Sequence, residues 1–62
     1  MKKGIYVGEF NERDLDSGAD KAAVAKKMAE TGLSYTNTEV VYKNGRPIGM
    51  KIWVCSADEF EV

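Results

Sequence analysis

The sequence contains no histidine, one cysteine and one proline among its 62 residues. Without histidine, the chain lacks the side chain best suited to transfer protons near neutral pH and the commonest metal ligand. The single cysteine, Cys55, cannot form an intramolecular disulfide, which excludes the disulfide scaffold of small secreted proteins and favours a reducing, cytoplasmic location. We therefore expect no enzymatic activity, no cofactor and no metal site.

Long apolar segments and a strong excess of one charge are also missing. No apolar run approaches the roughly 20 residues that span a bilayer, so we expect no membrane segment. The N-terminal stretch is too interrupted for a signal peptide, and we expect no export. Nine basic and ten acidic residues give a formal net charge of −1. A charge this small indicates neither a nucleic-acid partner nor an acidic substrate. A composition of 44% hydrophobic and 31% charged residues predicts one globular domain over residues 1–62.

The first part of the chain predicts a strand and a loop. Residues 4–10 are rich in β-branched and aromatic types, which favours a strand. Alternation along this strand places Ile5 and Val7 on one face, and Tyr6 and Phe10 on the other. The polar, unpatterned run from Asn11 to Gly18 predicts a loop.

A helix is predicted over Ala19–Thr31, which is rich in alanine and lysine. Ser17 and Asp20 have the spacing of an N-terminal capping box, and Gly32 suits a left-handed C-terminal cap. The apolar stripe of this helix is thin because alanine contributes little area, and it comprises Ala22, Val24, Ala25, Met28 and Ala29. The side chains expected to face solvent are Lys26, Lys27 and Glu30.

The dipeptide Asn44-Gly45 predicts a two-residue hairpin turn between strands over residues 33–43 and 46–55. With Lys43 opposite Arg46, counting outward gives one face of the second strand a core stripe of Ile48, Met50, Ile52 and Val54. The same counting pairs Pro47 with Tyr42, where the missing amide costs no hairpin bond.

The predicted fold class is α+β, a three-stranded, mostly antiparallel sheet with one helix packed on one face. The chain order is β-α-β-β, and the capping-box spacing of residues 56–59 predicts a short helical turn near the C-terminus. The antiparallel strand order 1-3-2 is favoured over a sheet in which the first two strands pair in parallel.

One alanine-lined helix covers only one face of the predicted sheet. The opposite face is left with the large side chains Tyr6, Phe10, Val40, Tyr42 and Trp53. An apolar patch of this kind exceeds what soluble monomers leave bare and indicates an interaction surface. We expect one of three elements to cover this patch: the chain's own end with Phe60 and Val62, a second copy stacked sheet on sheet, or a foreign partner. The alternative is that these aromatic residues are purely structural.

We expect a non-enzymatic interaction protein, a homodimer that inhibits or regulates a larger protein or assembly, as small bacterial and viral accessory proteins do. The candidate partner-binding residues are Tyr6, Phe10, Tyr42, Lys43, Arg46, Lys51 and Trp53. The alternative is a small nucleic-acid-binding regulator whose aromatic face stacks bases inside a basic rim. We do not favour it, because the composition is not basic.

Overall fold

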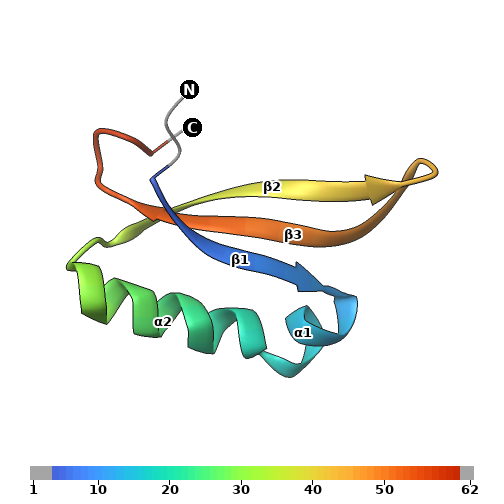
Figure 1. Cartoon of the computed structure of the whole chain (residues 1–62), viewed down its shortest axis with the longest axis horizontal. Coiled ribbons are helices and arrows are strands. Elements are labelled where there is room, and N and C mark those ends of the chain that lie inside the picture. The colour runs from blue at the N-terminus through green and yellow to red at the C-terminus, as the bar shows by residue number, and fades with distance from the viewer. Residues whose placement is uncertain (1–3, 61–62) are drawn as a thin grey trace.

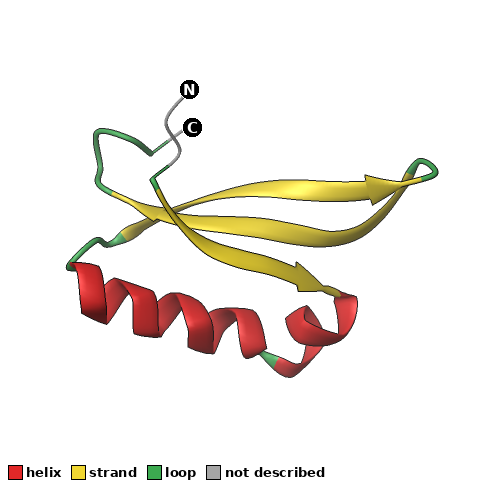
Figure 2. Cartoon of the chain, viewed as in Figure 1, coloured by secondary structure: helices red, strands yellow, loops and turns green. Residues whose placement is uncertain are grey.

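The computed structural model describes residues 4–60, which form one three-stranded sheet and two helices (Figures 1 and 2). In chain order the elements are β1 (Ile5–Asn11), α1 (Glu12–Ser17), α2 (Ala19–Thr31), β2 (Tyr35–Lys43) and β3 (Arg46–Cys55). All strand pairs are antiparallel and the strand order is β1-β3-β2, so β3 is central and the other two strands are edges. The predicted α+β fold and strand order are confirmed. Among residues 4–60, neither helix has the length and apolar character to cross a membrane.

Helix α1 occupies a segment for which the sequence predicted a loop, and that prediction is wrong. The reason is a capping box six residues earlier than the predicted one. The Asn11 side chain accepts a hydrogen bond from the Asp14 amide at 2.9 Å, and the Asp14 carboxylate accepts one from the Asn11 amide at 3.2 Å. This reciprocal pair satisfies two backbone donors at the start of a helix.

The predicted capping box of α2 is not formed. The Ser17 hydroxyl donates to the Asp14 carbonyl at 3.2 Å and accepts a hydrogen bond from the Ala19 amide, the first of α2, at 3.4 Å. Gly18, at φ 84°, lies between the two helices and has no side chain with which to cap α2. A left-handed conformation is inexpensive only for glycine, which explains the abrupt change of direction here.

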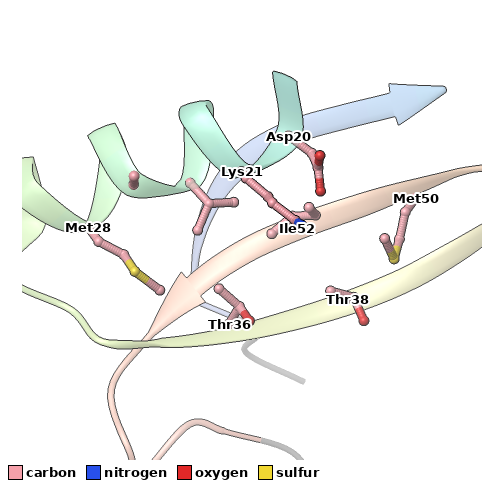
Figure 3. A pocket seen from close by; sticks show the side chains of 9 residues that line it. Asp20, Lys21, Met28, Thr36, Thr38, Met50 and Ile52 are labelled. Carbon is pink, nitrogen blue, oxygen red and sulfur yellow. The ribbon is translucent and has the colours of Figure 1, made fainter. Parts of the chain in front are cut away.

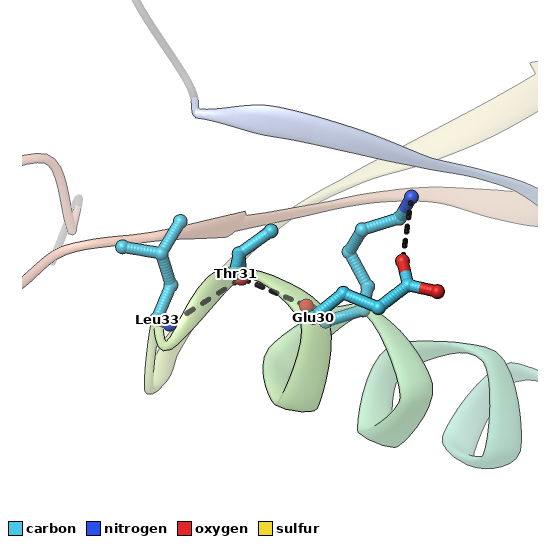
Figure 4. Close-up of polar contacts among 4 residues, drawn as sticks. Glu30, Thr31 and Leu33 are labelled. Atoms are coloured by element: carbon cyan, nitrogen blue, oxygen red, sulfur yellow. Dashed lines mark hydrogen bonds and ion pairs between the residues drawn. The ribbon is translucent and has the colours of Figure 1, made fainter.

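The C-terminal end of α2 agrees with the sequence prediction. Gly32 adopts the left-handed conformation, and its amide donates to the Met28 carbonyl at 2.8 Å. The Thr31 hydroxyl donates to the Lys27 carbonyl at 2.7 Å and accepts from the Leu33 amide at 3.3 Å (Figure 4). These bonds satisfy the last carbonyls of the helix and direct the chain towards β2.

The orientation of α2 about its own axis differs from the predicted one. Val24 and Met28 are half-buried as expected, but Ala22, Ala25 and Ala29 are exposed. Lys27 is half-buried, although it was expected to face solvent. The larger apolar side chains bury more area than alanine does, so the helix packs on Val24 and Met28 and leaves Ala22, Ala25 and Ala29 exposed.

The hairpin turn is confirmed, but the register beyond it is shifted. Asn44 at φ 53° and Gly45 at φ 77° are both left-handed, as the predicted turn requires. Lys43 pairs with Arg46 and Tyr42 with Pro47 as predicted, and the register then shifts so that Val41 pairs with Gly49. Ile48 is therefore the extra residue of a β-bulge in β3, and every later pair is displaced by one residue.

A second bulge interrupts the pairing of β1 with β3. Val7 is its extra residue, because Tyr6 pairs with Trp53 and Gly8 with Ile52. Phe10 consequently pairs with Met50 and shares a face with Ile5, not with Tyr6. The predicted faces of this strand are wrong beyond the bulge.

The two faces of the sheet differ in what covers them. The helix face, on which α2 packs, carries Met50, Ile52 and Val54 of β3. The other face, which carries Lys51 and Trp53 and is crossed by the C-terminal turn, is called the tail face. Among the described residues the buried apolar side chains are Ile52, Val54 and Cys55, so the core lies in the central strand.

The capping box of α1 gives a direct test of this local structure. We expect Asn11→Ala to lower the free energy of unfolding by about 1 kcal/mol, because it removes the N-terminal cap. Ser17→Ala is the control and is expected to cost less, because its hydroxyl accepts only a long hydrogen bond of 3.4 Å from the first amide of α2 and forms no capping box there. Urea denaturation followed by Trp53 fluorescence measures both. Equal losses for the two variants would contradict the observed capping.

Candidate functional site

The seven predicted partner-binding residues do not form one surface. Phe10 and Tyr42 belong to the helix face, while Tyr6, Lys51 and Trp53 belong to the tail face. The remaining two, Lys43 and Arg46, form the last pair before the hairpin turn. The predicted aromatic face therefore does not exist, because each of the two bulges changes which side chains share a face.

The tail face keeps one aromatic pair, Tyr6 with Trp53. Their ring centroids lie 5.4 Å apart with an interplanar angle of 54°, a tilted arrangement between directly opposite residues. Tyr6 is 49% exposed. Two rings of which one is half-exposed make a smaller apolar surface than the five side chains predicted from the sequence.

The C-terminal turn covers the other end of the tail face. The Phe60 amide donates to the Ser56 carbonyl at 3.2 Å, which confirms the predicted single helical turn. The nearly buried Asn37 side chain donates to the Glu59 carbonyl at 3.0 Å, and the Phe60 ring lies 5.3 Å from that of Tyr35. The chain's own end, one of the three alternatives for covering the aromatic patch, thus folds back onto the sheet, but Phe60 lies against Tyr35, which is not one of the five patch residues. Val62 lies outside the described residues.

The predicted basic rim is not formed on the tail face. Lys51 is directly opposite Glu9 in β1 and Glu39 in β2, so a carboxylate lies on each side of it. Opposite charges on neighbouring strands reduce the positive potential that attracts phosphates. Lys43 and Arg46 instead line a hollow of about 320 Å³ that they share with Glu12 of α1.

An apolar concavity lies on the helix face, between α2 and the sheet. Among the described residues, α2 has close neighbours in β1 and β3 but none in β2 (Figure 1). A groove of about 370 Å³ results (Figure 3). Its lining residues are Asp20, Lys21, Val24, Ala25 and Met28 of α2, Thr36 and Thr38 of β2, and Met50 and Ile52 of β3. We call this the α2–β2 groove.

The α2–β2 groove is apolar along its length and polar at one end. Val24, Met28 and Met50 are among the apolar residues of the lining, while Asp20 and Lys21 come from the first turn of α2. One Asp20 carboxylate oxygen is shielded from solvent and accepts no hydrogen bond from any described residue. The groove thus offers an apolar surface with two charged side chains at one end.

The exposed apolar surface continues from the groove along β2. Val40 and Tyr42 are 44% and 63% exposed, and both share a face with Thr38. The sequence reasoning included Tyr42 in the candidate site but missed the groove. The available signal was the pair Val24 and Met28, which the sequence placed correctly on the packed side of the helix.

The tail gives a prediction about stability. Ending the chain after Cys55 removes the acceptor for the buried Asn37 amide and uncovers Tyr35, so we expect the free energy of unfolding to fall by about 2 kcal/mol. Urea denaturation measures the change. In the control, Phe60→Ala, the backbone acceptor remains, and the loss is expected to be about half as large. A shortened chain of unchanged stability would contradict the role of the tail as a cover.

Comparisons of the chain with protein-family models, with curated proteins and with solved structures find no match. Among residues 4–60, no three histidine, cysteine, aspartate or glutamate side chains lie close enough to hold a metal ion. The site that combines apolar surface, concavity and an unsatisfied polar atom is the α2–β2 groove.

Proposed function

We propose that this chain is a non-enzymatic interaction protein that inhibits or regulates a larger protein by binding it through the α2–β2 groove. The observation that carries the proposal is the position of α2, which lies over β1 and β3 and leaves the helix face of β2 bare. Soluble domains seldom leave a continuous apolar surface uncovered, and such surfaces are typical of binding sites.

The shape of the groove favours an amphipathic helix of the partner as its occupant. A helix lying beside α2 above β2 contacts Met28 on one side and Thr36 and Thr38 beneath it. Neighbouring helices pack about 8–10 Å apart, and a two-helix layer is the ordinary cover of a three-stranded sheet. The partner therefore supplies the second helix that this chain lacks on that face.

The polar end of the groove favours polar side chains on the partner at that end. Asp20 and Lys21 place a carboxylate and an ammonium group there, although one oxygen of Asp20 is closed to solvent and so to a partner's side chain. Polar contacts at this end fix the direction in which the partner lies, while the apolar length of the groove supplies the area.

Two alanines of α2 provide a matched test. Ala25 lines the groove and Ala22 does not, yet both are exposed positions of the same helix. We expect Ala25→Glu to abolish co-purification of the partner from native cells, because a carboxylate placed in an apolar interface loses its hydration. Ala22→Glu is expected to retain it. Quantitative mass spectrometry of the material bound to the tagged chains measures the difference.

Neither substitution places a charge in the core of the protein, so both variants are expected to unfold at the same urea concentration as the original chain. A partner retained equally by both variants would contradict the assignment of the groove. Loss of binding in both variants would also contradict it, because the contact surface would then include the outward side of α2.

A further inference from the structure

The two edges of the sheet differ in how well they are protected against pairing with another strand. The bulge at Val7 interrupts β1, and bulges at edges discourage such pairing. In the β2–β3 pair the extra residue, Ile48, belongs to β3, so β2 runs uninterrupted from Tyr35 to Lys43. β2 contains no proline or glycine and is rich in threonine and valine. Its edge is therefore a regular template for another strand.

The open part of this edge is its second half. The first half of β2 contacts the C-terminal turn, because the Asn37 side chain donates to the Glu59 carbonyl and the Tyr35 ring packs against Phe60. From Thr38 to Lys43 the residues are exposed except for the half-buried Val41. A pairing strand therefore has access to residues 38–43.

We propose that two copies of this chain pair antiparallel through their β2 edges, with the two-fold axis at Val41. A two-fold axis perpendicular to the sheet keeps every residue on its own face. Directly opposite residues of a sheet also share a face, so their residue numbers differ by an even number and the axis passes through the residue midway between them. With the axis at Val41, Val40 lies opposite Tyr42 of the second copy and Glu39 lies opposite Lys43 of the second copy. Symmetry forms each pair twice.

Charge complementarity selects this register among those that the open edge permits. An axis at Glu39 places that carboxylate opposite its own copy, and like charges directly opposite destabilise a sheet. An axis at Val40 places Glu39 opposite an apolar side chain, Val41. Only the axis at Val41 sets Glu39 against a lysine, and it also brings together the exposed Val40 and Tyr42, a valine–aromatic pair of the kind that stabilises sheets.

The resulting assembly is a continuous six-stranded sheet with both α2 helices on one face. The two α2–β2 grooves then adjoin across the paired β2 strands. Sheet-on-sheet stacking through an aromatic face, one of the three alternatives from the sequence, is not favoured for this dimer, because the aromatic residues do not share a face. The dimer does not depend on what the groove binds.

Charge reversal tests the proposed pairs. Sedimentation velocity between about 5 μM and about 1 mM is expected to show a concentration-dependent monomer–dimer equilibrium, as a small interface gives. Lys43→Glu or Glu39→Lys alone is expected to raise the dissociation constant roughly tenfold or more, and the double variant to restore it.

Lys43→Glu also separates association from folding. In the monomer Lys43 lies opposite Arg46, so the substitution replaces a like-charge pair with an opposite-charge pair and is not expected to weaken the hairpin. A chain that stays monomeric over the whole concentration range would overturn the proposal. Single variants that dimerise like the original chain would overturn it too.

Cysteine substitution tests the register independently. Directly opposite residues have Cα atoms about 4.5–5.5 Å apart, which is within the range of a disulfide. We expect Val41→Cys to form a covalent dimer rapidly under mild oxidation. Val40→Cys and Glu39→Cys are the controls, since these positions are then about 8 Å or more from their own copies. The native Cys55 is buried and is expected to remain unlinked. Faster linkage at position 39 or 40 than at 41 would overturn the register.

Discussion

Helix α2 packs on two of the three strands of the sheet, β1 and β3. The exposed apolar surface on the helix face of β2 follows from this position. Thirteen residues of helix pack over β1 and β3, and the helix face of β2 has no layer above it. The buried apolar side chains of the described residues are consequently confined to β3. A small domain buries only a limited fraction of its apolar surface, and Val40 and Tyr42 of β2 are among the apolar side chains that stay exposed here.

Two single-residue bulges decide which side chains are neighbours. Without them, strict alternation gives the aromatic face predicted from the sequence. With Val7 and Ile48 as extra residues, Phe10 and Tyr42 lie on one face, and Tyr6 and Trp53 on the other. The same shift sets Glu9 and Glu39 beside Lys51, so charges on the tail face compensate one another. The bulges thereby place the exposed apolar side chains Val40 and Tyr42 on the helix face, away from Tyr6 and Trp53.

Local signals in the sequence predict the elements well and their lateral arrangement poorly. Asn44-Gly45, the helix over Ala19–Thr31 and its cap at Gly32 depend on contacts between residues close in sequence, and all three are confirmed. Helix α1 also had a local signal, the pair Asn11 and Asp14, which the sequence reasoning passed over. Bulges and the rotation of α2 depend on packing between distant segments, and no residue pattern in a single strand or helix predicts them. The groove was missed for that reason.

The exposure of β2 on the helix face is the claim on which the groove depends, and solvent relaxation of methyl resonances measures it most directly. With a soluble paramagnetic agent, the methyl groups of Thr38 and Val40 are expected to relax as strongly as that of the outward-facing Ala22, while those of Ile52 and Val54 stay protected. Edge pairing brings Tyr42 of a second copy beside Val40, so the result is expected at concentrations at which the chain is monomeric. Protection of Thr38 and Val40 to the degree seen for Ile52 would show that the face is already covered and would contradict the account.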